Sequence, residues 1–132
     1  MKSLLIVFAL LTIQSCAINQ KIVSPENQTQ SLIGKWKLYK TVHVKADNIE
    51  PQITKHNSFL EFNKSRFKRI NDKGLVTSSG IYEVMFNQIT YFLTNKSHIS
   101  LTYYIERNTL IETHHDKYDL AVTTSFYKYI LP

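Results

Sequence analysis

The chain has 132 residues, with 16 Lys and Arg against 10 Asp and Glu, and a formal net charge of +6. This length favours one domain with a modest core. The basic side chains are largely scattered along the chain, so the composition does not predict a nucleic-acid-binding protein.

Residues 1–15 have the layout of a secretory signal peptide. Lys2 supplies a positive charge, and an unbroken apolar run extends from Leu4 to Leu11. A charged start followed by a short apolar run is typical of such signals. The run is too short for a transmembrane helix, which needs about 20 apolar residues. The sequence therefore predicts an exported protein that loses residues 1–15.

The signal ends at the only cysteine of the chain, in the segment Ile13-Gln14-Ser15-Cys16. Exported proteins normally use cysteines in pairs, so a lone cysteine at this place favours an attachment point. The segment resembles the lipobox of bacterial lipoproteins. The resemblance implies cleavage between Ser15 and Cys16, acylation of Cys16, with palmitate as a donor chain, and membrane attachment through the acyl chains. An ordinary secreted protein with an incidental Cys16 is the alternative.

Residues 16–31 are polar, with one proline and several Asn and Gln residues. This composition is typical of a flexible linker, and we expect a lipidated tether here, followed by one domain over residues 32–132. Ala17 does not resemble an inner-membrane retention signal. We therefore expect a cell-envelope location at the periplasmic face of the outer membrane.

From Ile33 onward, short stretches of alternating apolar and polar residues are separated by polar turns, with no helical period. Trp36, Leu38, Val42 and Val44 share one parity and predict a long first strand. A longer connection with Pro51 is expected over residues 45–58. The remaining strands are expected at residues 59–62, 66–70, 80–86, 89–93, 99–105, 110–114 and 121–130.

These strands follow one another through tight turns, so consecutive strands are expected to pair as antiparallel neighbours. Closure of eight such strands would remove the exposed edges that an open sheet would leave. The sequence thus predicts an all-β fold, a single antiparallel up-and-down barrel of eight strands.

The start of the predicted domain carries a family resemblance. The segment from Leu32 to Leu38, with Gly34 and Trp36, is similar to the Gly-x-Trp start of the lipocalins, part of the calycin superfamily, and especially to small bacterial lipocalin-like lipoproteins. The resemblance implies that Trp36 closes the floor of the barrel. It also implies a basic side chain from the last strand over the Trp36 ring, and Lys128 is the candidate.

An eight-stranded barrel either fills its interior with side chains or holds one small ligand. The expected inward residues are bulky, so a plain core is one interpretation. Buried tyrosines need hydrogen-bond partners, however, and a polar ligand could supply them. On that second interpretation the candidate ligand-binding residues are Tyr82, Phe86, Tyr91 and Tyr103. The other inward candidates are Phe62, Val84, Leu93, Leu101 and Ile105.

The sequence does not predict an enzyme, a metal site or a cofactor. His114, His115 and Asp116 form the densest cluster of suitable side chains. Adjacent strand residues point to opposite faces, so His114 and His115 are not expected to bind one metal ion. None of the usual catalytic motifs is present.

Two functions remain open. The family resemblance implies a lipid-anchored carrier or sensor of a small, partly apolar molecule. We expect this protein to be a monomer without catalytic activity. The alternative is a protein-interaction module, such as an envelope inhibitor, immunity-type protein or assembly factor, with a filled barrel. Such a module would use the connection over residues 45–58 and the basic hairpin around Arg66, where Lys64, Lys68, Arg69 and Lys73 also lie.

Overall fold

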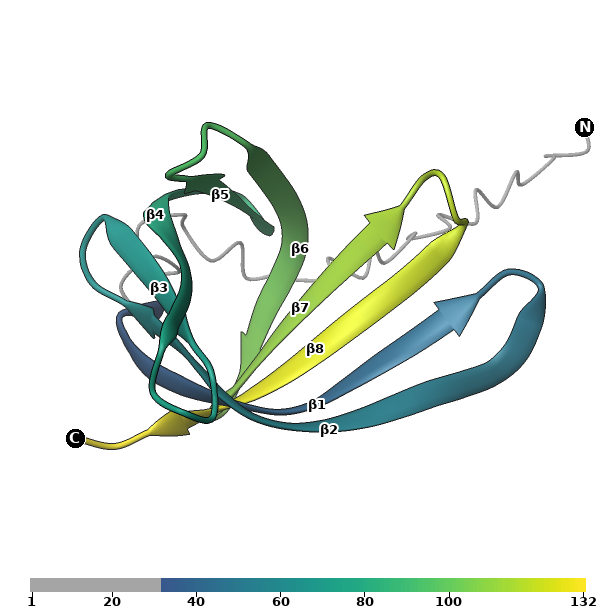
Figure 1. Cartoon of the computed structure of the whole chain (residues 1–132), viewed down its shortest axis with the longest axis horizontal. Helices are drawn as coiled ribbons and strands as arrows, with labels where there is room; N and C mark the ends of the chain where they lie inside the picture. Colours follow the sequence, from purple (N-terminus) through teal and green to yellow (C-terminus); the bar gives the residue numbers. More distant parts are fainter. Residues whose placement is uncertain (1–31) are drawn as a thin grey trace, which may run out of the picture.

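The computed structural model describes residues 32–132, and within them eight antiparallel strands form one closed barrel (Figure 1). Each strand pairs with the next along the chain, and β8 pairs back with β1. The predicted all-β, up-and-down barrel is confirmed. The strands are β1 (Gly34–Lys45), β2 (Asn48–Phe62), β3 (Arg66–Ile70), β4 (Val76–Met85), β5 (Gln88–Leu93), β6 (His98–Glu106), β7 (Thr109–Asp116) and β8 (Ala121–Ile130).

The predicted signal peptide, the cleavage site at Ser15 and Cys16, and the tether lie outside the described residues. In residues 32–132 there is no helix of the length and apolar character that a membrane span requires.

One end of the barrel is filled by its own side chains. Their burial removes apolar surface from water, which is the main force that holds such a fold together. Aromatic rings meet edge to face inside it, with Phe67 and Tyr91 centroids 4.6 Å apart and Phe62 and Tyr82 centroids 4.9 Å apart. We call this the closed end. Its buried residues include Leu32, Trp36, Leu60, Phe62, Phe67, Tyr82, Ile89, Leu101, Tyr103 and Leu110.

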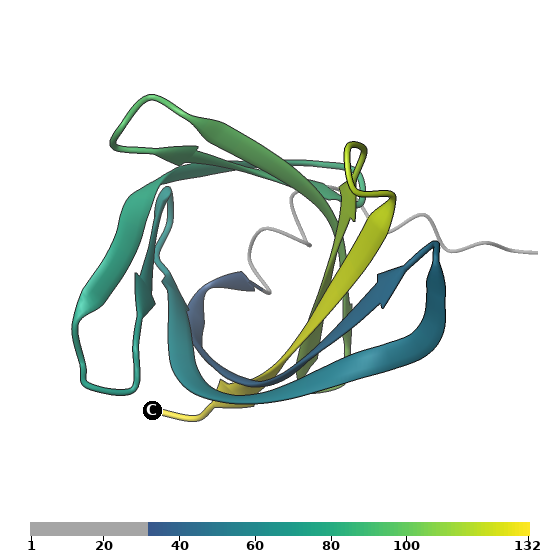
Figure 2. The same cartoon turned by 45° about the vertical axis from the view of Figure 1, so that its right-hand side comes forward.

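Two of the eight ladders end while at least one of their strands continues, and this shapes the other end of the barrel. The β2–β3 ladder joins only Phe59–Phe62 to β3, and the β6–β7 ladder stops at the pair Thr102 and Thr113. Beyond these points β7, β8, β1 and β2 continue together as a four-stranded extension (Figure 1). We call this extension, residues 40–58 and 113–126, the arm. Figure 2 shows the strands around the ring, with the arm diverging from the wall of β3 to β6.

The expected connection over residues 45–58 is wrong, because β2 occupies most of it. Only Ala46 and Asp47 separate β1 from β2. Pro51 is tolerated where the register shifts, between the pairs His43↔Gln52 and Lys45↔Asn48. The sequence pattern failed because this part of β2 carries polar side chains on both faces, so it lacks the apolar alternation by which strands are recognised.

The single parity expected for β1 is also wrong beyond Leu38. Leu38 pairs with Tyr127 but Lys40 pairs with Phe126, so β1 has one extra residue at Tyr39. Such a bulge reverses the faces of all residues that follow. Thr41 and His43 therefore point inward, whereas Val42 and Val44 point outward, where Val44 is exposed.

Candidate functional site

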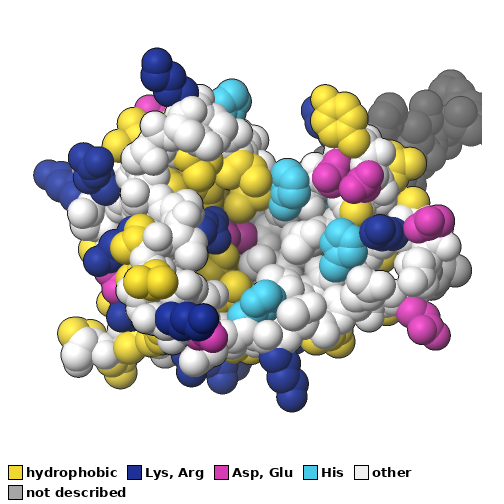
Figure 3. Space-filling view, in the orientation of Figure 1, with side chains coloured by type: hydrophobic (Ala, Val, Ile, Leu, Met, Phe, Trp, Pro, Cys, Tyr) yellow, Lys and Arg dark blue, Asp and Glu magenta, His cyan; other side chains and the backbone are white. Residues whose placement is uncertain are grey.

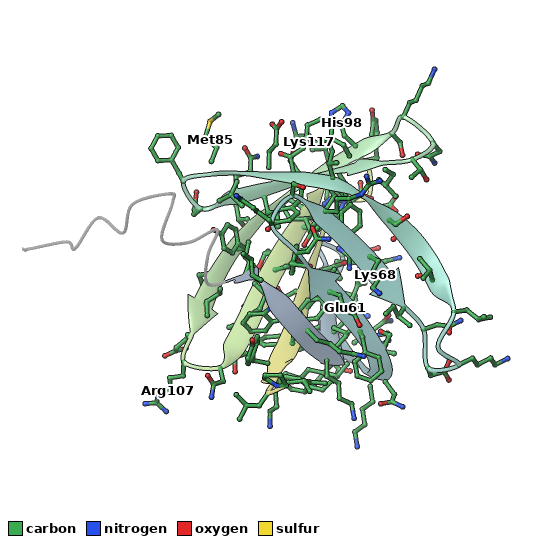
Figure 4. The ribbon with its side chains drawn as sticks, turned by 90° about the vertical axis from the view of Figure 1, so that its left-hand side faces the viewer. Glu61, Lys68, Met85, His98, Arg107 and Lys117 are labelled. Carbon is green, nitrogen blue, oxygen red and sulfur yellow. The ribbon has the colours of Figure 1, made fainter. Side chains whose placement is uncertain are left out.

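The space between the arm and the wall of β3 to β6 is hollow, as the space-filling view into this side of the molecule shows (Figure 3). Where the β6–β7 ladder ends, the two strands separate and leave an opening of about 540 Å³. Figure 4 shows His98 and Lys117, which border it on its two sides. The opening is lined by His98, Ile99, Ser100, His114, His115, Asp116, Lys117 and Tyr118.

The inner face of the arm is polar because of the bulge at Tyr39. Residues that pair directly share a face, so the ladders place two rows of side chains inside. One row is His114, Thr123, His43 and Gln52. The next begins at Glu112, directly before the arm, and continues with Ser125, Thr41 and Thr54.

Hydrogen bonds hold two of the arm's histidines in place. His43 Nδ1 lies 2.8 Å from Thr123 Oγ1, and His56 Nε2 lies 2.9 Å from Thr41 Oγ1. These contacts join β1 to β8 and β1 to β2. They give the arm an ordered polar surface toward the hollow.

The opposite wall is apolar. Ile99 pairs with the buried Tyr91, and Leu93 pairs with Gly80, so both aliphatic side chains face inward and pack against the core. In Figure 3, hydrophobic side chains gather on the wall to the left of the hollow, and histidines lie along its right side. A molecule in the hollow would thus meet an apolar wall and a polar wall.

A charged cluster lies between the closed end and the hollow. Glu112 is buried and accepts hydrogen bonds from the hydroxyls of Tyr91 and of Tyr127, the latter at 2.9 Å. Arg69 Nη1 donates to the Tyr127 hydroxyl at 3.0 Å, and its Nη2 lies 3.6 Å from Glu112 Oε2. The guanidinium also lies 4.9 Å from the centre of the Tyr91 ring. We call these four residues the floor cluster.

Burial changes the acidity of the tyrosines. Desolvation, followed by the negative charge of Glu112, raises the pKa of Tyr91 and of Tyr127 above the usual value for tyrosine. Desolvation also raises the pKa of Tyr82, and it raises that of Tyr103 to about 12. All four phenols therefore hold their protons more tightly in the folded barrel than in the unfolded chain.

This difference predicts a loss of stability in alkali. An ordinary tyrosine ionises near pH 10. A raised folded-state pKa contributes stability that is fully present below pH 10 and is lost as the pH rises toward 12 and above. A spectrophotometric tyrosine titration of the native protein should lag behind the same titration in urea, and the lagging phenols should ionise as the barrel unfolds. Coincident curves would contradict the burial of these phenols.

Three of the four candidate ligand-binding residues are buried in one core cluster, and none of the three lines the opening. Tyr91 belongs to the floor cluster, and Tyr82 donates its hydroxyl hydrogen to Asn63 O at 2.8 Å. Tyr103 is buried in the closed end. Phe86 is 70% exposed, and its inward placement is wrong. It occupies the two-residue turn between β4 and β5 with φ +55°, so the reversal begins one residue earlier than expected.

Gly34 and Trp36, which were expected to close the barrel, lie at its closed end, but Tyr129 takes the place expected for Lys128. Trp36 is buried, donates from Nε1 to Leu32 O at 2.8 Å, and contacts Tyr129 edge to face at 5.0 Å. A Cβ at Gly34 would collide with the Tyr129 ring. Lys128 points outward, with Nζ 5.4 Å from the centre of the Tyr39 ring. The group from the last strand that contacts Trp36 is therefore the Tyr129 ring, and the expected contact with Lys128 is not formed.

His114 and His115 lie on opposite faces of β7, as strand alternation predicts. Within residues 32–132 no group of three His, Cys, Asp or Glu side chains is arranged to hold a metal ion.

The sequence patterns did not predict the floor cluster. Arg69 was grouped with the surface bases of the β2–β3 hairpin, although it shares parity with the buried Phe67. Glu112 lies between the inward positions Leu110 and His114. In each case, alternation with a neighbouring inward residue of the same strand would have predicted that the side chain points inward.

The structure is similar to that of a lipocalin-like protein from Bacteroides uniformis, known from a crystal structure at 1.79 Å resolution. The TM-score is 0.56 and the sequence identity 19%, over 75% of this chain and 98% of that chain. No protein-family model and no curated protein matches the sequence. At this identity the similarity concerns the fold alone. The described domain has a lipocalin-like fold.

Proposed function

We propose that this chain is a lipid-anchored cell-envelope protein that binds a small, partly apolar molecule in the hollow between the arm and the wall of β3 to β6. The observation that carries the proposal is the opening between β6 and β7, with apolar Ile99 on one side and polar His114 on the other. Binding pockets typically combine apolar lining with a few polar groups. The lipocalin-like fold supports the same function, and Cys16 would provide the anchor.

The proposal predicts that a small molecule copurifies with the protein. Native mass spectrometry of the wild-type protein should detect a bound species besides the covalent acyl chains. Ile99→Asp should lose this species, because a carboxylate on the apolar wall disfavours an apolar group there. Ile53→Asp is the matched control, since Ile53 is 64% exposed on the outer face of the arm. Loss of the species in both variants, or in neither, would contradict this location.

The anchor is tested separately. Radiolabelled palmitate should enter the wild-type protein and not the Cys16→Ser variant, because the thiol is the proposed acylation site. Absence of label from the wild-type protein would remove the anchor from the proposal and leave the binding site untouched.

A protein-interaction module is the second candidate, and one observation favours it. A second, separate pocket of about 320 Å³ lies beside the β2–β3 turn on the basic hairpin. It is lined in part by Asn63, Arg66 and Lys68. The hairpin is less basic than the sequence suggested, because Arg69 points inward and Lys68 pairs with Glu61 at 2.8 Å (Figure 4). Absence of any copurifying molecule would favour this candidate.

A further inference from the structure

The acids that face the hollow are already engaged inside the protein. Glu112 accepts hydrogen bonds from Tyr91 and Tyr127 and lies beside Arg69. The Asp116 carboxylate accepts the backbone N–H groups of Tyr118 at 2.8 Å and of Asp119 at 3.2 Å. Both carboxylates thus accept hydrogen bonds from groups of the protein itself, and Arg69 offsets the negative charge of Glu112.

Over residues 32–132, the nitrogen atoms of the basic side chains around the hollow make fewer hydrogen bonds within the protein than the carboxylates do. His114 lines the opening, and within the described part of the chain its buried Nδ1 has no hydrogen-bond partner. A buried polar atom without a partner is unfavourable, so a ligand that supplies one gains free energy on binding. His98 and Lys117 add basic groups at the rim of the same opening.

Arg69 extends this pattern to the base of the hollow. Its guanidinium has five N–H donors, of which one donates to Tyr127 and another faces Glu112 at 3.6 Å. About a third of its side chain is exposed. In Figure 3, basic and acidic side chains are visible at the base of the hollow. The site therefore has N–H donors beyond those used in these contacts, and its two carboxylates already accept hydrogen bonds within the protein.

We propose that the molecule bound in the hollow is an organic anion with an apolar body, such as a carboxylate on an alkyl chain. Its anionic group would contact His114 and Arg69, and its apolar body would lie against Ile99 and Leu93. This inference rests on the proposed function and deepens it, because it names the chemical class of the ligand.

The test compares three probes that share one alkyl chain: octanoate, octanol and octylammonium. They are titrated by calorimetry into the full-length Cys16→Ala protein, which has no acyl chain and is unchanged over residues 32–132. We expect octanoate to bind at least tenfold more tightly than octanol, and octylammonium to bind most weakly. Equal binding of octanoate and octanol, or tightest binding of octylammonium, overturns the inference while supporting the proposed function. Absence of binding by all three overturns both.

The contact with His114 is tested by substitution. His114→Phe should reduce the preference for octanoate over octanol by at least fivefold, because the ring nitrogens are lost and the apolar wall is kept. Tyr104→Phe is the control, since Tyr104 is 55% exposed on the outer face of β6 and does not line the opening, and it should change the preference less than twofold. His114→Asn serves if His114→Phe does not fold. An unchanged preference in the folded His114 variant overturns the assignment of this contact.

Discussion

Glu112→Ala is expected to destabilise the barrel far more than the removal of a carboxylate from its surface. The substitution leaves the Tyr91 and Tyr127 hydroxyls and the Arg69 guanidinium without their shared acceptor. Breaking a buried ion pair on one side costs about 3–5 kcal/mol. Because Arg69 is a third exposed, we expect a loss at the lower end, about 3 kcal/mol in the free energy of unfolding. Urea denaturation monitored by circular dichroism measures this change.

Glu61→Ala is the matched control for that experiment. Glu61 also contacts two cations, Lys35 at 3.1 Å and Lys68 at 2.8 Å, but on the outside of the barrel (Figure 4). Exposed ion pairs contribute about 0–1 kcal/mol, so the loss should stay within that range. Equal losses for the two variants would mean that the floor cluster is no more important than a surface ion pair.

Trp36→Ala is expected to have the largest effect among apolar substitutions. It removes a buried ring from the closed end, together with the contact to Tyr129 and the hydrogen bond to Leu32 O. Replacing a buried tryptophan by alanine costs about 3–5 kcal/mol, because transfer energy is lost and a cavity remains. The measurement is again the free energy of unfolding in urea.

Two further variants separate the loss of the Trp36 hydrogen bond from the loss of its buried ring. Trp36→Phe keeps an aromatic ring but loses the Nε1 donor, so a loss of about 1–3 kcal/mol is expected from the unsatisfied carbonyl. Leu75→Ala removes an apolar side chain that is 62% exposed and should stay within about 0.5 kcal/mol. A loss for Trp36→Ala no greater than for Leu75→Ala would contradict the burial of Trp36.

The strands with one apolar face were predictable from the sequence. β3 and β8 match the expected residues, because alternation and turn residues both mark their ends. β2 was largely missed because its outer half pairs only with β1 and faces the polar hollow, so neither face needed apolar residues. Alternation of apolar and polar residues identifies strands with one buried apolar face, so it cannot identify a strand whose inner face is polar.

The site was less predictable than the fold, for a geometric reason. One bulge at Tyr39 exchanges the two faces of the outer half of β1 and brings His43 to the inside in place of Val44. The position of such a bulge depends on pairing with β8, which local sequence does not specify. Arg69 was misplaced for a related reason, since charge suggested the surface while its pairing with buried Leu60 places it inside.

The proposed function requires that the closed end is filled and that the hollow between the arm and the wall of β3 to β6 receives the ligand. Amide chemical shifts recorded during a titration with octanol distinguish these two parts of the barrel. We predict the largest shifts at residues 98–100 and 114–116, on the two sides of the β6–β7 opening, and small shifts around Trp36. Saturable shifts confined to the closed end or to the outer face of the barrel would contradict binding in the hollow.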